Sequence, residues 1–270
     1  MSSINRRSFL AACAGSLGLA LSACGGSAPA DSASKAESQD YKLVKPGTLI
    51  FVSELEFPPL DSFEDGVPKG FDVDLSHEIA ERMGLKCEYL PPQNFDSIIP
   101  MIKQGGKADV GNSAFSVTEE RKAEIDFSDP YLDSNLGIAV RNDSDARDEN
   151  TLNAEDKKIA VQAGSTGEAW VRENLPQATV VPIDSVTSCM TGVEAGQYAA
   201  FCGDLPVVAY LSNSFPNCEI AKEIPTGEQY ALVISKNNPA LTAAINEVLA
   251  DLRSDGTIDE LEEKWFGRVL

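Results

Sequence analysis

The sequence has little of what metal and redox chemistry requires. It holds a single histidine, His77, and no two cysteines separated by two residues. Zinc sites and dithiol redox centres are built from such residues. Neither a G-x-S-x-G nucleophile turn nor a G-x-x-x-x-G-K-[ST] phosphate loop is present. We therefore expect no metal, no cofactor and no nucleophilic catalysis.

Positive charge is also scarce. The chain has 22 Lys and Arg against 42 Asp and Glu, and its formal net charge is −20. Removing residues 1–23, which hold two arginines and no acid, would make the net charge −22. Such a surface repels nucleic acid and anionic lipid headgroups, so nucleic-acid binding is excluded as the function.

The N-terminus has the pattern of an export signal. Arg6 and Arg7 precede a stretch of small and apolar residues that ends near residue 23. This stretch is shorter than the roughly 20 residues of a membrane-spanning helix, so we interpret residues 1–23 as a signal peptide. The arginine pair resembles a twin-arginine signal. Leu21-Ser-Ala-Cys24 resembles a bacterial lipobox, which implies cleavage before Cys24 and a lipid on its thiol.

Residues 24–44 are rich in Gly, Ser, Ala, Asp and Lys, with no apolar periodicity. Such a segment buries too little to order itself, so we expect a flexible, lipidated tether. Disulfides persist in exported chains, and spacing does not choose among the three pairings open to the remaining cysteines. These are Cys87, Cys189, Cys202 and Cys218.

The rest of the chain repeats one α/β pattern twice. The continuous apolar run at 48–52 predicts a strand that is buried on both faces. The first unit then continues with a helix at 70–83, a strand at 87–90, a helix at 95–103 and a strand at 108–111. The second unit has strands at 137–140, 158–161, 179–181 and 199–202 and helices at 168–174 and 186–195. We expect turn structure at 61–69 and a polar connection at 142–156.

Residues 230–234 are expected to cross back as a strand, followed by helices at 240–252 and 258–265. The fold class is therefore α/β with two lobes joined by two crossings, each lobe a mostly parallel sheet flanked by helices. We place lobe 1 at 45–134 plus 229–270 and lobe 2 at 135–228. Small ligands bind in clefts between such domains.

The stretch Ala108–Arg121 predicts an anion site. Ser116 and Glu119 have the spacing of a capping box, although Thr118 could cap instead, so a helix should begin at about residue 117–119. The hydroxyls of Ser113, Ser116 and Thr118 and the guanidinium of Arg121 would then converge on one point. Helix-terminus donors and a bidentate arginine suit a carboxylate. The alternative is a capped surface helix with a solvated Arg121.

The segment Gly70-Phe-Asp-Val-Asp-Leu75, followed by Ile79-Ala80, resembles a known signature. It is similar to that of the bacterial extracellular solute-binding proteins of polar amino-acid ABC importers, family 3. The resemblance covers the chain from about Lys45 onward and implies the two-lobed, periplasmic-binding-protein-like type II fold. Further motifs fall in family order: Phe57-Pro-Pro59, residues 118–121 with 127–131, Gly164-Ser-Thr166, Gly203-Asp204 and residues 255–257 with 264–267.

The resemblance implies roles for the groups that hold the ligand backbone. Arg121 would pair with the ligand α-carboxylate, assisted by backbone groups at Ala114 and Ser116. Thr166, after a Gly-Ser turn on the second lobe, would be the other carboxylate donor. Asp204 would take the α-ammonium.

The same resemblance implies a side-chain pocket. Phe57 and Phe95 match aromatic walls, whose faces suit aliphatic stems and cations. Glu54 lies where relatives carry an acid or amide that contacts the ligand side chain. The chain also departs from the family pattern, with Phe57 in place of a tyrosine and Ala114 in place of a serine found in some basic-amino-acid binders.

Each of these residues has an alternative interpretation. Arg121 could pair with Asp126 on its own lobe. Asp204 could cap the helix that begins at Leu205, and the two phenylalanines could belong to a core.

The function implied by the resemblance is binding without chemistry. It is that of an extracytoplasmic, membrane-anchored, monomeric protein that closes on an L-amino acid. The protein would deliver this ligand to an ABC permease driven by ATPase subunits, both encoded separately. Arg121 offsets the ligand carboxylate and Asp204 its ammonium, which leaves Glu54 uncompensated; a buried lone carboxylate is costly. A basic or amide side chain is therefore favoured.

Two alternatives remain open at this point. Some exported relatives of this fold are dehydratases of cyclohexadienyl acids, for which Glu168 is a conceivable catalytic acid. The other is a sensory ligand-binding module.

Overall fold

The structure is a computed structural model that describes residues 41–269. The predicted signal peptide, the lipidation site Cys24 and all but the last residues of the tether lie outside the described residues. Within residues 41–269, no helix combines the length and the apolar character needed to cross a membrane.

The first sheet has five strands in the order β5-β1-β6-β13-β7. The strand β1, which lies between β5 and β6, is buried throughout, as its continuous apolar sequence predicts. The strands β5 and β6 run parallel to β1, whereas β13 runs antiparallel to β6 and β7. The strands are β1 (Thr48–Val52), β5 (Lys86–Tyr89), β6 (Val110–Gly111), β7 (Asp126–Phe127) and β13 (Val233–Ile234). Its helices are α1 (Phe71–Arg82), α2 (Phe95–Gln104), α3 (Glu119–Glu124), α8 (Pro239–Ser254) and α9 (Thr257–Phe266).

The second sheet has the order β10-β9-β11-β8-β12. Here β10, β9 and β11 are parallel, β8 is antiparallel to β11, and β12 is antiparallel to β8. The strands are β8 (Leu132–Arg141), β9 (Lys158–Gln162), β10 (Thr179–Ile183), β11 (Ala200–Asp204) and β12 (Cys218–Tyr230). Its helices are α4 (Glu149–Leu152), α5 (Thr166–Asn174), α6 (Val186–Glu194) and α7 (Leu205–Ser214).

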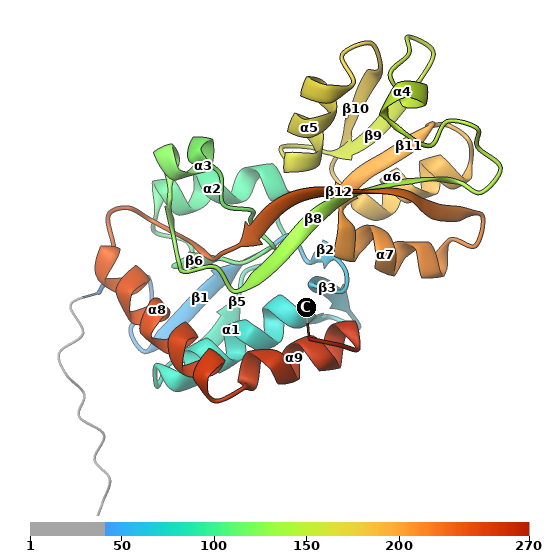
Figure 1. Cartoon of the computed structure of the whole chain (residues 1–270). Helices are drawn as coiled ribbons and strands as arrows, with labels where there is room; N and C mark the ends of the chain where they lie inside the picture. Colours follow the sequence, from blue (N-terminus) through green and yellow to red (C-terminus); the bar gives the residue numbers. More distant parts are fainter. Residues whose placement is uncertain (1–40, 270) are drawn as a thin grey trace, which may run out of the picture. The chain divides into compact units, whose positions relative to one another are not determined.

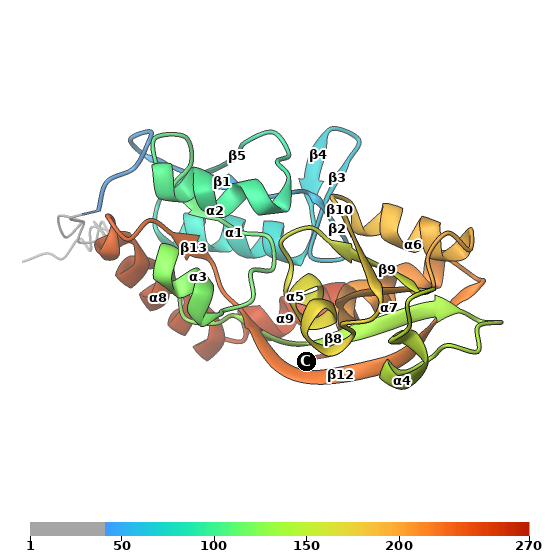
Figure 2. The same cartoon turned by 90° about the horizontal axis from the view of Figure 1, so that it is seen from above.

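The strands β8 and β12 join the two sheets. They pair from Leu132↔Tyr230 to Arg141↔Cys218, with register shifts between, and Figures 1 and 2 show them side by side between the two sets of helices. The two-lobed α/β class with two crossings is confirmed. Both sheets are mixed, since β13 in the first sheet and β8 in the second run antiparallel to both of their neighbours. The lobe boundaries at 134/135 and 228/229 stay a prediction.

The return crossing lies earlier than the sequence predicted. Residues 230–234 were expected to make it, but β12 does so from Cys218, and only Val233–Ile234 belongs to the first sheet. Most of β12 is exposed and polar, and it contains Pro225 and Gly227. It therefore lacks the apolar pattern that marks a buried strand.

The prediction of a turn at 61–69 is wrong. This stretch forms the strands β3 (Asp61–Glu64) and β4 (Val67–Lys69), which make a small sheet with β2 (Glu56–Phe57). Asp65 and Gly66 both have positive φ and connect the two strands as a two-residue hairpin loop. Asp-Gly between strands is a strong hairpin signal, and it was present in the sequence.

The four cysteines of the described residues are all free. They lie on β5, α6, β11 and β12, and all but Cys87 are buried, so each is held apart by its own packing. Burial raises the pKa of the Cys189 thiol to about 12. The disulfide pairings left open by the sequence are therefore not formed, and these thiols behave as small apolar side chains.

Gly70 gives the fold a sensitive point. Its φ is +137°, and a Cβ there would overlap the carbonyl oxygen of Leu60. We expect Gly70→Ala to lower the free energy of unfolding by roughly 3 kcal/mol or more, because both the backbone angle and the clash oppose it. Urea unfolding measures this. Gly84 also has positive φ, but a Cβ there would meet nothing within 4 Å, so Gly84→Ala should cost only about 1 kcal/mol. Equal losses in the two variants would contradict the assignment.

Candidate functional site

A small cavity lies where segments of the two sheets meet. Its volume is about 10 Å³, which is roughly the room that one water molecule needs. All the predicted site residues line it except Glu54 and Ser113, and sequence reasoning missed Gln162 and Ser165. The lining is Phe57, Phe95, Ala114, Ser116, Arg121, Gln162, Ser165, Thr166 and Asp204.

Arg121 is positioned by the start of α3. Thr118 caps this helix, since its hydroxyl accepts the N–H of Arg121 at 3.1 Å. The second of the two predicted caps is therefore the observed one. The guanidinium donates to the carbonyl of Ser116 at 2.8 Å and to that of Gly164 at 3.1 Å. Because Gly164 precedes α5, Arg121 touches both halves of the site.

Aromatic faces support the same guanidinium. Its central carbon lies 5.4 Å from the ring centroid of Phe95 and 5.7 Å from that of Phe115, and the two rings stack on each other. Cations bind such faces. The alternative pairing with Asp126 is not formed, because that carboxylate accepts the hydroxyl of Thr242 at 2.8 Å.

Burial lowers the pKa of the Arg121 guanidinium, and the nearby carboxylates of Asp204 and Glu228 oppose that shift. Arginine stays charged in proteins. The cavity therefore holds a fixed cation, and an anionic group placed there would form a charge-assisted hydrogen bond with it.

Asp204 enters the cavity from the end of β11. It precedes α7, but its side chain does not cap that helix, so the alternative of a simple cap is wrong. Its Oδ2 instead accepts the hydroxyl of Tyr230 at 2.6 Å. Burial, followed by the neighbouring charge of Glu228, raises the pKa of Asp204 from 3.8 to about 7, against the Tyr230 hydrogen bond and Arg121. A cation beside Asp204 would favour its ionised form.

The raised pKa of Asp204 predicts a pH-dependent stability. The folded chain holds a proton that the unfolded chain releases above about pH 4, so this contribution to stability is lost as pH rises through about 7. We expect the urea midpoint of ligand-free protein to fall between about pH 5 and about pH 8, and to fall less in Asp204→Asn. Equal slopes in wild type and Asp204→Asn would refute this assignment.

Glu54 is buried beside the cavity. Its Oε2 accepts the amide of Gln162 at 2.6 Å, so the end of β1 and the end of β9 are joined here. Its Oε1 is buried without a hydrogen-bond partner within residues 41–269. Burial and the charge of Asp61 raise the pKa of Glu54 well above its ordinary value. The site therefore contains an acceptor atom that a donor could still use.

The hydroxyls of Ser116 and Thr166 share one acceptor. Ser116 Oγ lies 2.5 Å from Oε2 of Glu228, and Thr166 Oγ1 lies 2.9 Å from the same oxygen. Sequence reasoning did not single out Glu228. The polar segment around it carries no pattern that points to a site.

Ser113 does not reach the cavity, so its predicted convergence with Arg121 is wrong. Its hydroxyl donates to Asp61 at 2.7 Å. The N–H of Ala114 is also engaged, since it donates to Asp72 at 2.8 Å. Both aspartates are buried, and buried carboxylates need donors. The loop after β6 supplies them, so Ala114 lines the cavity while its N–H points elsewhere.

Glu168 has a structural position. Its carboxylate accepts the N–H of Gly164 at 2.8 Å and pairs with Arg172 at 2.6 Å on the next turn of α5. It is not part of the cavity lining. No cluster of possible metal ligands occurs among the residues that the structure describes.

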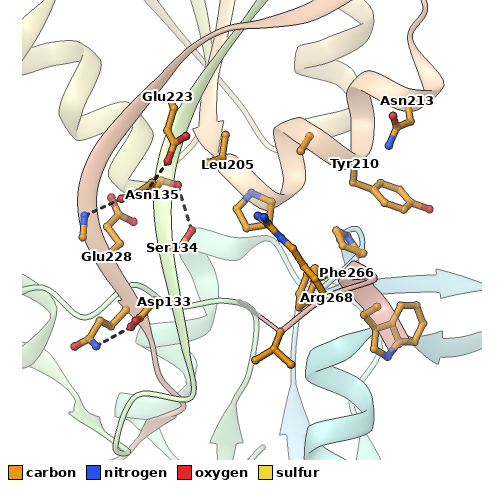
Figure 3. Close-up of a pocket in the computed structure, with 17 residues that line it drawn as sticks. Asp133, Ser134, Asn135, Leu205, Tyr210, Asn213, Glu223, Glu228, Phe266 and Arg268 are labelled. Carbon is orange, nitrogen blue, oxygen red and sulfur yellow. Dashed lines mark hydrogen bonds between the residues drawn. The ribbon is translucent and has the colours of Figure 1, made fainter. Parts of the chain in front are cut away.

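A second cavity of about 720 Å³ lies behind β8 and β12. Figure 3 shows its wall, where residues of these strands face α7 and the C-terminal segment. Glu228 belongs to this wall, next to Asn135 and Glu223. Ser116 and Thr166, whose hydroxyls contact Glu228, line the small cavity instead.

The arrangement of a fixed cation from α3 and a buried acid from the end of β11 can be compared with known proteins. The model of the bacterial extracellular solute-binding proteins, family 3, matches residues 49–268. The chain belongs to this family. The family assignment made from the sequence is therefore confirmed, and it accounts for the two mixed sheets joined by two crossings.

Relatives of this family 3 member cover most of its length. The glutamine-binding protein GlnH of the Bacillus subtilis ABC transporter is 29% identical and covers 91% of this chain and 92% of its own. An ancestral arginine-binding protein, solved with arginine, has 34% identity and a TM-score of 0.77 over 82% of this chain and 98% of its own. An ancestral arginine-binding protein solved with glutamine has 35% identity and a TM-score of 0.78, over 83% of this chain and 100% of its own.

A further solved structure bears on the enzymatic alternative. It is an ancestral amino-acid-binding protein described as a precursor of cyclohexadienyl dehydratase. It is 33% identical, has a TM-score of 0.75 and covers 82% of this chain and 95% of its own. It too is named as a binding protein.

Proposed function

We propose that this chain is the amino-acid-binding component of an ABC importer. It binds one L-amino acid between its two lobes and delivers the ligand to a membrane permease driven by separate ATPase subunits. The observation that carries the proposal is the placement of Arg121 and Asp204. They enter one cavity from the two lobes, Arg121 from α3 and Asp204 from the end of β11, which is the arrangement that an α-carboxylate and an α-ammonium require.

The backbone of the ligand would be held by charge. Arg121 takes the α-carboxylate, with help from the backbone N–H groups at the start of α5, that of Thr166 among them, which lack partners within the helix. Asp204 takes the α-ammonium. Ligand binding in an open form, followed by closure, would expel water and strengthen both charge pairs. Ser116 and Ala114 also line this cavity.

The side chain of the ligand would lie toward Phe57, Phe95 and Glu54. The two rings are nearly buried, at 4% and 8% exposure, and they suit an aliphatic stem. Oε1 of Glu54 can accept a hydrogen bond from a guanidinium, an ammonium or an amide. The glutamine- and arginine-binding relatives agree with this chemistry, so we assign the ligand to the basic and amide L-amino acids.

The location and assembly form part of the same proposal. Residues 1–23 would be removed on export, and a lipid on Cys24 would anchor the protein outside the cytoplasm through the tether at 24–44. A monomer with a free cleft suits delivery to a permease. The strongly acidic surface would keep the protein away from anionic headgroups.

Thermal denaturation with each of the twenty L-amino acids tests this function. The test requires protein that lacks residues 1–24, so that neither the signal peptide nor the lipid interferes. A basic or amide amino acid should raise the melting temperature by mass action, while L-glutamate and L-aspartate should not. The proposal would be rejected if none of the twenty amino acids raised the melting temperature.

No chemical step is part of this function. The carboxylate considered for a dehydratase, Glu168, is occupied by Gly164 and Arg172. Incubation with prephenate or arogenate should therefore give no turnover. Turnover would instead support an enzyme on the same fold.

A further inference from the structure

Glu228 lines the second cavity and contacts two residues of the small cavity, Ser116 and Thr166. It lies on β12 two residues before Tyr230, so both side chains are on the same face of the strand. Tyr230 donates to Asp204 at 2.6 Å, and Glu228 accepts from Ser116 and Thr166 at 2.5 and 2.9 Å. One strand thus supports three of the cavity-lining side chains.

The neighbouring backbone holds Glu228 in place. Ser116 and Tyr230 form an antiparallel bridge, and Val117 N–H donates to the carbonyl of Gln229 at 2.9 Å. On the other side, Gly227 N–H donates to the side chain of Asn135 at 3.0 Å. The strand is therefore fixed on both sides of Glu228, and its carboxylate has a defined direction.

The contact with Glu228 determines whether the hydroxyls of Ser116 and Thr166 can donate or accept in the cavity. Each hydroxyl has one proton to donate and two lone pairs to accept with. In this structure the protons of both Ser116 and Thr166 are directed to Glu228, which is itself not part of the small cavity lining. Their remaining lone pairs are then left for the cavity, where they act as acceptors.

We propose that Glu228 is a positioning residue that orients the hydroxyls of Ser116 and Thr166 as acceptors for the α-ammonium of the ligand. An ammonium has three donors, and Asp204 need satisfy only part of them. Glu228 also adds a negative charge near Asp204. The pair of hydroxyls would therefore discriminate an amino acid from an analogue that lacks the amino group. This inference rests on the proposed function.

The test compares wild type with Glu228→Gln by calorimetry on two matched pairs of probes. These are L-arginine with 5-guanidinopentanoate and L-glutamine with glutaramate, which differ only in the α-amino group. For the amino acid that wild type prefers, Glu228→Gln should weaken binding roughly tenfold. The amino-lacking analogue should change much less, so the ratio between the two falls. A purely structural role would lower both affinities alike.

Two variants act as controls. Glu223→Gln alters another carboxylate of β12, one that lines the second cavity and accepts a hydrogen bond from the Asn135 amide at 3.0 Å, and it should keep the wild-type ratio. Glu228→Asp retains the charge and should recover part of the lost ratio.

Three results would overturn the inference. An unchanged ratio in a folded Glu228→Gln protein would remove the orienting role. Tighter binding of the amino acid in that variant would mean that Glu228 competes with the ligand carboxylate. A wild type that binds neither amino acid would reject the proposed function and this inference together, whereas the first two results reject the inference alone.

Discussion

Arg121→Ala is expected to abolish the binding of L-amino acids while leaving the protein folded. The guanidinium is the cation of the small cavity, and it is already oriented by two carbonyls and two aromatic rings. Its loss leaves the ligand carboxylate desolvated without a partner, which should weaken affinity by at least about 100-fold. Calorimetry with the preferred amino acid measures the loss.

The melting temperature of Arg121→Ala without ligand should change little, because Thr118 still caps α3 and the arginine is partly exposed. Arg172→Ala is the matched control. It removes an arginine of α5 whose partner is Glu168, and binding should stay at the wild-type level. Wild-type affinity in Arg121→Ala would remove this residue from the site.

Glu54→Gln is expected to change which side chain the protein accepts. Oε1 of Glu54 is a buried acceptor with no partner within the described chain, and the raised pKa of this group follows from burial and from Asp61. A guanidinium offsets the cost of a buried carboxylate, but it gains much less from a neutral amide. L-arginine affinity should therefore fall roughly 100-fold, and L-glutamine affinity by less than about tenfold.

Glu56→Gln controls for this experiment. Glu56 is two residues away, is exposed, and has no resolved role in the cavity. Its substitution should leave both affinities unchanged. If Glu54→Gln bound L-arginine with wild-type affinity, the ligand side chain would be recognised by other residues.

Much of the fold could be predicted because its buried segments carry strong local patterns. The strand at 48–52 is apolar at every position, and the helices at 71–82 and 95–104 have regular apolar spacing. The long strand β12 could not be predicted in the same way. It is held by pairing with β8, while most of its side chains face solvent.

The site residues likewise fall into those marked by a local sequence signal and those defined by contacts between distant segments. Arg121 and Asp204 stand beside local signals, a helix start and a strand end, and the family resemblance assigned them to one ligand. The partners of Glu54 and Thr166 come from segments more than 60 residues away in the sequence, at distances of 108 and 62 residues. Such contacts depend on how the lobes meet, which spacing along one chain does not encode.

The error at Ser113 has a related cause. Its hydroxyl was expected at the anion site because it precedes Arg121 in a polar stretch. In the structure, Asp61 and Asp72 are buried beside that stretch and take the donors of Ser113 and Ala114. A buried carboxylate from another element decides the direction, and sequence alone did not place either aspartate there.

The central claim is that the two lobes hold an L-amino acid by both of its α groups, with a basic or amide side chain toward Glu54. The most direct test is calorimetric titration of protein lacking residues 1–24, refolded from urea to remove any bound ligand. The titrants are L-arginine, L-glutamine and L-glutamate. We predict one-to-one binding of L-arginine or L-glutamine, with no heat from L-glutamate. Tight binding of L-glutamate without binding of the other two would contradict the account.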